Sequence, residues 1–199
     1  MPIEKKFHHA KFWGDLGKHM VDPVEMVEVY EDLDGERWMV VTDTVACARQ
    51  PMPASFACGA WKPEKEYIQV AIPRHGALYP LSYPALATAE GPADSLLRAL
   101  LPFVPNDKKD RARFTLVLGL GECRAEEAPG FEELHGEAAV VLHGWKAIGE
   151  YRIILDARRL RQMIKASGAV DLELHYRDKD HPLLIEGDTL SGLLMPINI

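Results

Sequence analysis

The stretch that decides the fold begins with Glu150-Tyr151-Arg152-Ile153-Ile154-Leu155 and ends with Leu193-Leu194-Met195-Pro196-Ile197-Asn198-Ile199. The first run is typical of a strand, and a short helix from Asp156 to Ala166 follows it and stops at Ser167-Gly168. Three strand-like runs come after the helix, the last of them at the C-terminus. The order of one strand, one helix and three strands predicts an α+β fold of antiparallel sheet with short helices.

The predicted helix separates its apolar side chains from its cationic ones. Asp156 is a good N-cap residue, because its carboxylate can accept hydrogen bonds from the first backbone N–H groups. The apolar stripe consists of Ala157, Leu160, Met163 and Ile164. The opposite face holds Arg158, Arg161, Gln162 and Lys165, with Arg159 beside them. No acidic residue occurs from 157 to 166, so this face is either a solvated surface whose cations favour the helix C-terminus or a contact surface for nucleic-acid phosphates.

The composition is that of an ordinary soluble protein with an acidic surface. The 199 residues are 47% hydrophobic and 27% charged, and the net charge is −7. This charge argues against a uniformly basic nucleic-acid coat but leaves room for a local basic stripe. Met1 to Lys6 lacks the apolar core of a signal peptide, and no run approaches the roughly 18 apolar residues of a membrane span. We therefore expect a cytoplasmic protein without a membrane partner.

The first 90 residues predict a domain of strands preceded by a helix. His8 to Met20 has helical spacing of its apolar residues. Val24 to Tyr30 and Arg37 to Thr42 predict a hairpin, since a turn sequence separates them. Tyr67 to Ile72 alternates like a strand, whereas Gln50 to Pro63 is rich in proline and small residues and predicts a loop.

A shift in composition near residue 90 predicts a boundary between two domains, 1–90 and 91–199. Before it, Arg74 to Gly91 predicts a broken short helix or a connector. After it, Asp94 to Leu101 predicts a helix, with Asp94 or Ser95 as its cap and Pro102 at its end.

The second domain continues with strands on either side of an acidic loop. Phe114 to Leu118 and Ala138 to Leu142 predict strands, and Glu122 to Gly136 between them predicts the loop. The clearest alternation is that of Val170 to Tyr176. It predicts that Val170, Leu172, Leu174 and Tyr176 point inward.

Two stretches resemble the sliding clamp of bacterial DNA polymerase. The first runs from Ala138 to Ile199 and contains the strand-to-helix passage Ile153-Ile154-Leu155-Asp156 and the terminal Met195-Pro196. The second runs from Trp38 to Gly76. It contains Thr42-Asp43-Thr44, Gln50-Pro51-Met52-Pro53 and Val70-Ala71-Ile72-Pro73-Arg74-His75-Gly76, which are similar to a clamp pattern of Ala-Thr-Asp-Gly, a Met-Pro loop and Val-Pro-Arg-Lys-Gly.

The resemblance implies two clamp-like domains whose helices line the pore of a ring and face DNA. The residues that it places against phosphates are Arg158, Arg161 and Lys165, with Lys11 and Lys18 from the first predicted helix. It also implies a hydrophobic pocket for short peptides of partner proteins, formed by Leu193, Met195, Pro196 and Ile197. Flexible methionine suits such a pocket. The alternative is that Leu193 and Met195 alternate into the core of the sheet.

The sequence also departs from the clamp pattern. Thr44 replaces the glycine of the Thr-Asp-Gly turn, and Val45-Ala46-Cys47 replaces the His-Arg-Leu that follows it. This set lies at the peptide pocket and near DNA in the family. The chain has the length of two domains, where bacterial clamps have three. These departures favour a shortened or phage-like member.

Motifs that would indicate an enzyme or a metal protein are absent from the sequence. No GxSxG, HExxH or Walker motif occurs, and Gly119-Leu120-Gly121 is a weak nucleotide signal. The histidines 8, 9 and 19 lack a carboxylate or cysteine at ligand spacing, and the three cysteines form no CxxC pair. We therefore expect no catalytic residue, no metal and no cofactor.

The leading hypothesis is a non-enzymatic, homo-oligomeric sliding clamp. It would encircle double-stranded DNA without sequence specificity and tether DNA polymerase and other replication proteins through clamp-binding peptides. The alternative is a clamp-like adaptor or decoy that binds replication proteins without forming a DNA ring. A third hypothesis is an enzyme or small-ligand protein with its site in the acidic loop 122–136.

Overall fold

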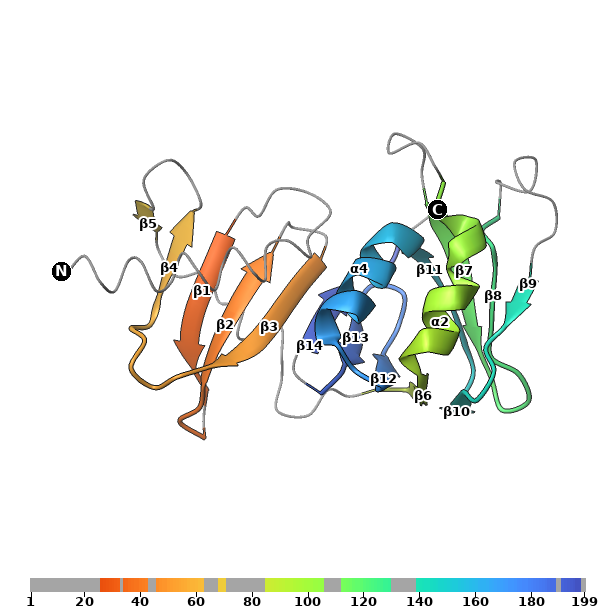
Figure 1. Ribbon diagram of the computed structural model, residues 1–199, viewed down its shortest axis with the longest axis horizontal. Helices are drawn as coiled ribbons and strands as arrows, with labels where there is room; N and C mark the ends of the chain where they lie inside the picture. The colour runs from red at the N-terminus through yellow and green to blue at the C-terminus, as the bar shows by residue number, and fades with distance from the viewer. Residues whose placement is uncertain are drawn as a thin grey trace.

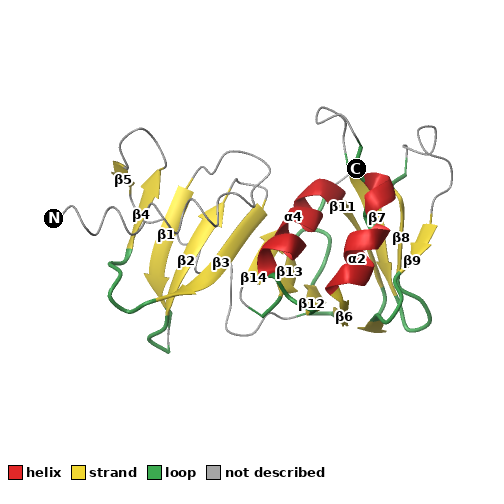
Figure 2. Ribbon diagram, in the orientation of Figure 1, coloured by secondary structure: helices red, strands yellow, loops and turns green. Residues whose placement is uncertain are grey.

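The described part of the chain contains two antiparallel sheets and the helices that pack on them. The computed structural model describes residues 26–32, 34–42, 46–62, 68–70, 85–105, 112–129, 139–188 and 191–197. One sheet has ten strands and the other has four (Figure 1). Helices α2 and α4 lie side by side and cover the same side of the C-terminal strands (Figure 2). This confirms the α+β class with antiparallel sheets and short helices.

The N-terminal half contributes one end of the ten-stranded sheet. Its strands are β1 (Met26–Glu31), β2 (Arg37–Thr42), β3 (Ala46–Met52), β4 (Gly59–Lys62) and β5 (Ile68–Val70). Their order in the sheet is β3-β2-β1-β4-β5. The hairpin of β1 and β2 is confirmed, and its turn is held by Asp32, whose Oδ1 accepts hydrogen bonds from the backbone N–H groups of Asp34 and Glu36.

The C-terminal half contributes the other end of this sheet and the whole of the second one. Its elements are β6 (Ala87–Pro92), α2 (Ala93–Ala99), the 3-10 turn η2 (Leu101–Phe103), β7 (Arg113–Leu118), β8 (Arg124–Glu127), β9 (Ala139–Val141), β10 (Lys146–Ile148), β11 (Tyr151–Asp156), α4 (Ala157–Ser167), β12 (Asp171–Tyr176), β13 (Leu183–Glu186) and β14 (Ser191–Leu194). The second sheet has the order β11-β7-β8-β9.

The C-terminal half is an internal duplication. The order strand, helix, three strands occurs first as β6-α2-β7-β8-β9 and again as β11-α4-β12-β13-β14. The leading strand of each unit pairs with the three strands of the other, since β6 lies beside β12 and β11 lies beside β7. Neither unit can complete its own sheet, so the two fold as one body.

The two halves of the chain are joined through strands β14 and β3. They pair in antiparallel fashion, with Leu193 opposite Cys47 and Leu194 opposite Ala46. The two stretches that carried the clamp resemblance in the sequence are therefore neighbours in space. A continuous sheet runs from β10 at one end to β5 at the other.

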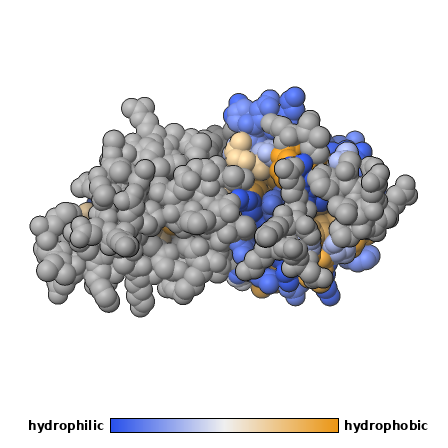
Figure 3. Space-filling model, turned by 90° about the horizontal axis from the view of Figure 1, so that it is seen from above, coloured by the Kyte–Doolittle hydropathy of each residue, from blue (hydrophilic) through white to orange (hydrophobic). Residues whose placement is uncertain are grey.

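The main core lies between the helices and the sheets. Its side chains come from α4, from the inward positions of β7, β11 and β12, and from the N-terminal strands. The largest fully buried ones include Met39, Leu96, Phe114, Leu116, Leu155, Leu160, Met163, Ile164, Leu172 and Leu174. The visible described surface above this core is mainly hydrophilic, with small apolar patches (Figure 3).

The prediction of a loop from Gln50 to Pro63 is wrong. Strand β3 extends to Met52, and β4 begins at Gly59. Among the described residues, β14 pairs with β3 only from Ala46 to Arg49, so Pro51 lies where one side of β3 needs no N–H donor. Sheet pairing thus accommodates a proline that, from sequence alone, indicated a loop.

Three predictions around the second domain also need correction. Residues 87–92, predicted as part of a helix or connector, form β6, because pairing with β12 and β10 outweighs the helix propensity of alanine. Helix α2 begins at Ala93 after Pro92 and has no side-chain cap, so neither Asp94 nor Ser95 has the predicted role. The helix already ends at Ala99.

The acidic loop is interrupted by a strand. Arg124–Glu127 form β8, which pairs with β7 and β9. Of the residues predicted to point inward from β12, Leu172 and Leu174 are buried, but Val170 is 76% exposed because it precedes the strand. The strands predicted around 67–72, 114–118 and 151–155 are confirmed as β5, β7 and β11.

Some predictions lie outside the described residues. They are the helix from His8 to Met20, with Lys11 and Lys18, and most of the segment from Arg74 to Leu86. Strand β6 spans residue 90, and the division into domains 1–90 and 91–199 stays a prediction. No helix among the described residues is long and apolar enough to cross a membrane.

A close contact in the duplicated unit gives a first testable prediction. A Cβ at Gly91 would lie 2.5 Å from Cγ of Trp145, which is buried and donates its Nε1 proton to the carbonyl of Pro92 at 3.2 Å. We expect Gly91→Ala to lower the free energy of unfolding by about 1–3 kcal/mol, because the indole must move. Urea denaturation measures this loss. Gly121→Ala is the control, since a Cβ there meets no atom within 4 Å, and equal losses in the two variants would contradict the prediction.

Candidate nucleic-acid and partner-binding surfaces

Helix α4 is held in place by caps at both ends and by a buried apolar stripe. Asp156 accepts hydrogen bonds from the backbone N–H groups of Arg158 at 2.9 Å and Arg159 at 3.0 Å, which confirms its predicted role as N-cap. Gly168 ends the helix with a φ of 60°, in the left-handed region that favours glycine. The predicted stripe is also confirmed, because Ala157, Leu160, Met163 and Ile164 are at most 1% exposed.

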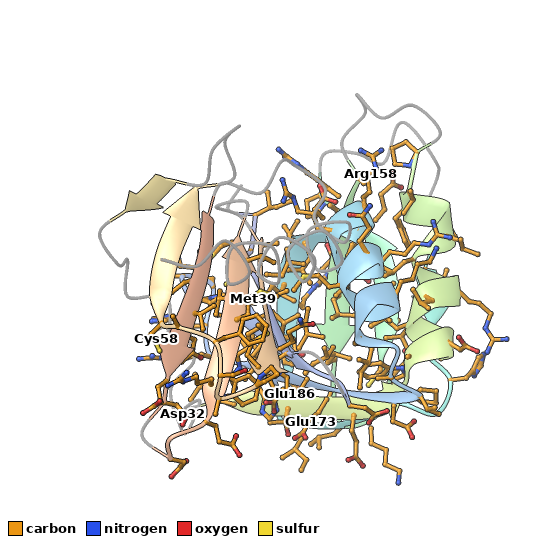
Figure 4. All side chains as sticks on the ribbon, turned by 60° about the vertical axis from the view of Figure 1, so that its left-hand side comes forward. Asp32, Met39, Cys58, Arg158, Glu173 and Glu186 are labelled. Atoms are coloured by element: carbon orange, nitrogen blue, oxygen red, sulfur yellow. The ribbon has the colours of Figure 1, made fainter. Side chains whose placement is uncertain are left out.

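The cationic side chains of α4 differ in exposure. Lys165 is exposed, and Arg158 and Arg161 are half-buried (Arg158 is labelled in Figure 4). Arg159, predicted beside the cationic face, is only 9% exposed. Within the described residues, Nε of Arg161 is shielded from solvent and makes no hydrogen bond. The face therefore offers three cations to a ligand, and two of them need a change of rotamer to extend fully.

Helix α2 adds one cation that the sequence reasoning missed. Arg98 is exposed, and its Nε donates to the backbone carbonyl of Asp94, one turn earlier, at 3.2 Å. Since α2 and α4 pack side by side, Arg98 lies on the same side of the sheets as the cations of α4 (Figure 1). The signal was the exposed position within the predicted helix 94–101. We call Arg98, Arg158, Arg161 and Lys165 the helix face.

A second hydrophobic cluster lies on the opposite side of the ten-stranded sheet. It consists of Val40, Cys47, Leu184 and Leu193, with Tyr30 packed against it, and we call it the outer cluster. Side chains alternate along a strand, and Leu194 and Gly192 face α4, where a Cβ on Gly192 would meet Met163. Leu193 therefore points away from the helices. It is 3% exposed, so it is part of a separate small core and not of the main one.

The C-terminal segment leaves the outer cluster and crosses to the second sheet. Met195 is 39% exposed, and Pro196 and Ile197 are half-buried. The backbone N–H of Ile197 donates to the carbonyl of Ile154 in β11 at 2.8 Å. Of the four residues predicted for a peptide pocket, Met195 offers the most accessible apolar surface, and Leu193 supports it from below.

Polar and aromatic side chains border the outer cluster on the N-terminal strands. The Arg49 guanidinium lies 4.3 Å from the ring centroid of Trp38 and donates to the Tyr30 hydroxyl at 3.3 Å. Nε1 of Trp38 donates to Asp32 at 2.8 Å, and this bond holds the pKa of the Asp32 carboxyl below its usual value. Burial raises the pKa of Tyr30. These contacts fix the orientation of the border residues through cation–π attraction and hydrogen bonds.

A surface cleft of 480 Å³ lies at the turn between β7 and β8, next to the start of β11. Its lining includes residues 117–122, Arg124 and residues 150–152. The charged groups are paired with one another, because Arg124 contacts Glu122 at 3.1 Å and Glu126 at 3.0 Å, and Arg152 also contacts Glu126. The described part of the acidic segment thus presents ion pairs, not a group poised for catalysis.

Two linked βαβββ units, with helices on one side and sheets on the other, define the fold of the DNA sliding clamps. The chain has this fold. Among solved structures, it is similar to the β sliding clamp of C. crescentus, with 15% identity and a TM-score of 0.69 over 88% of this chain and 57% of that one. It is also similar to the DNA polymerase β subunit of Streptococcus pyogenes, with 13% identity and a TM-score of 0.69 over 88% and 58%.

A third similar structure is the DNA polymerase sliding clamp of Pseudomonas aeruginosa, with 14% identity and a TM-score of 0.67 over 87% of this chain and 57% of that one. The chain therefore spans little more than half the length of these clamps. No protein-family model and no curated protein sequence matches it. At this level of identity the likeness concerns the fold.

Proposed function

We propose that the protein is a DNA sliding clamp, a non-enzymatic processivity factor that encircles duplex DNA and tethers replication proteins. The observation that carries the proposal is the helix face: four cations gather on the helix side of a clamp fold, in a chain with a net charge of −7. In the proposed ring this face lines the pore. Several copies would assemble head to tail in the cytoplasm, as a shortened or phage-like version of the three-domain clamps.

The proposed contacts suit a protein that slides. Arginine and lysine bind phosphates through charge and release condensed counterions, which supplies affinity without reading the bases. Such contacts are equivalent at every step along the duplex. The acidic remainder of the surface would keep DNA away from the outside of the ring.

The experiment that tests the proposal compares circular with linear DNA. The protein is loaded onto a nicked plasmid, passed over a sizing column in 0.3 M salt, and the plasmid is then cut with a restriction enzyme. A ring stays with the circle and leaves the cut DNA through its ends. Light scattering at several concentrations gives the native mass in parallel. A protein that stays monomeric and is lost equally from both DNA forms does not encircle DNA.

The second candidate is an adaptor that has the clamp fold and binds replication proteins without a ring. The half-burial of Arg158 and Arg161 favours it, because side chains that pack along the helix contact phosphates less readily. The adaptor is expected to bind partner peptides and to show no difference between circular and linear DNA.

Both candidates use the C-terminal segment for partner peptides, and this gives a prediction. We expect Met195→Ala to weaken binding of a clamp-binding peptide about tenfold, since the pocket loses its most accessible apolar side chain. Fluorescence anisotropy of a labelled peptide measures the change. Val170→Ala is the control, because Val170 is equally apolar and 76% exposed but lies at the start of β12. An unchanged affinity of the Met195 variant would remove this residue from the site.

A further inference from the structure

Three potential metal ligands meet on the sheet surface opposite the helices. Glu173 in β12 and Glu186 in β13 are directly opposite each other in the antiparallel register. His175 follows Glu173 by two residues and so points to the same face. Figure 4 shows the two labelled glutamates close together at this face. We call these three residues the His175 cluster.

The ligand atoms of the His175 cluster converge. Nε2 of His175 lies 2.9 Å from Oε2 of Glu186 and 3.4 Å from Oε1 of Glu173. One ligand atom from each residue lies within 4.8 Å of the other two. Nε2 is shielded from solvent, yet neither carboxylate meets it with the geometry of a hydrogen bond. An imidazole nitrogen is thus turned toward two carboxylates and has no directional partner.

The surrounding charges leave negative charge at this place. Like charges directly opposite on paired strands repel each other, and Glu90 on β6 extends the row beyond Glu173. The nearest cation from the N-terminal strands is Arg49, which acts on Glu186 across Ser191. It already serves the Tyr30 and Trp38 contacts described above. A cation placed between the two glutamates would relieve their repulsion.

We propose that the His175 cluster binds a divalent transition metal of the zinc class, with Nε2 and one oxygen of each glutamate as ligands. Zinc accepts imidazole nitrogen and carboxylate oxygen at about 2.0–2.2 Å, so its ligand atoms are about 3.3–3.5 Å apart in a tetrahedron. The 2.9 and 3.4 Å distances require only small side-chain movements. The imidazole disfavours magnesium and calcium, which take oxygen ligands. A fourth position remains for water.

The metal would also connect two strands beside the outer cluster. Leu184 of that cluster lies on β13 two residues before Glu186 and directly opposite His175. Coordination from both strands is expected to hold β12 and β13 together at this point and to raise the thermal stability of the protein in the presence of zinc. This consequence holds whether or not the protein encircles DNA.

The test is zinc binding by the full-length protein and three variants at pH 8, where protons compete weakly for imidazole. The variants are His175→Gln, Glu186→Gln and the control Glu90→Gln, which removes a carboxylate from the adjacent strand but not from the cluster. Isothermal titration gives stoichiometry and affinity, and cobalt absorption between 500 and 650 nm, on the order of hundreds of M⁻¹cm⁻¹, indicates tetrahedral coordination. Cys58 and the histidines 8, 9 and 19 are present in every variant, so any background binding is common to all.

We expect one zinc equivalent to bind the unaltered protein and the Glu90 variant alike, and the affinity of the other two variants to fall by at least about tenfold. The tetrahedral cobalt bands should vanish in the His175 variant. Glu186→Gln keeps the size of the side chain, so it remains informative if His175→Gln perturbs the fold. No saturable binding to the unaltered protein, or binding of equal strength in all four proteins, would overturn the proposal.

Discussion

Retention on circular DNA is expected to disappear when Arg158, Arg161 and Lys165 are replaced together by glutamate. The three side chains lie on the exposed side of α4, and its buried stripe of Leu160, Met163 and Ile164 is untouched. The substitution replaces attraction to phosphates with repulsion at the surface that is proposed to line the pore. Circular dichroism should show a folded protein.

The effect can be graded through salt. Each phosphate contact contributes about one unit to the slope of log affinity against log salt, so neutral replacement of all three residues by glutamine should lower the slope by about three. Filter binding between 50 and 200 mM salt measures the slope. The triple glutamate variant should bind too weakly for a slope to be determined.

The control has the same change in charge at another place. Lys146, Arg177 and Lys179 lie on β10 and on the turn after β12, away from the helix face. Replacing them with glutamate should leave retention nearly unchanged, apart from a general effect of net charge. If both triple variants lose retention equally, the DNA contact is not specific to α4. If the α4 variant retains circular DNA, the helix face does not line the pore.

The second large effect is expected at the strand that joins the two halves. Leu194 is fully buried on the α4 side of β14, opposite Ala46 of β3. Leu194→Ala should lower the free energy of unfolding by about 2–5 kcal/mol, because it removes buried methyl groups and leaves a cavity. The loss comes from the joint of the sheet, so both halves should unfold in one transition at a lower urea concentration.

The adjacent residue supplies the control. Met195 is 39% exposed, and Met195→Ala should cost less than about 1 kcal/mol. Urea unfolding followed by tryptophan fluorescence reports on Trp38 in the N-terminal half and Trp145 in the C-terminal half. Two separate transitions in the Leu194 variant would show that the halves fold independently. Equal losses for the two neighbours would contradict the assigned burial of β14.

The functional surfaces could be predicted from the sequence in unequal measure. The cationic face of α4 follows from helical spacing, because the residues that share a face are three or four positions apart. Arg98 was missed, since its relevance depends on α2 packing beside α4. The His175 cluster was also missed. Glu186 lies eleven residues after His175, and only the β12–β13 register places the two together.

The sequence alone determined the local elements with strong periodicity. Helix α4, its Asp156 cap, the hairpin of β1 and β2, and the alternating residues of β12 depend on interactions between near neighbours in the chain. Tertiary structure decided β3, β4, β6 and β8, whose proline, alanine or charged residues indicate loops or helices when read alone. These segments become strands because an adjacent strand satisfies their backbone N–H and C=O groups. That partner comes from a distant part of the chain, as when β14 completes β3, and no local pattern encodes it.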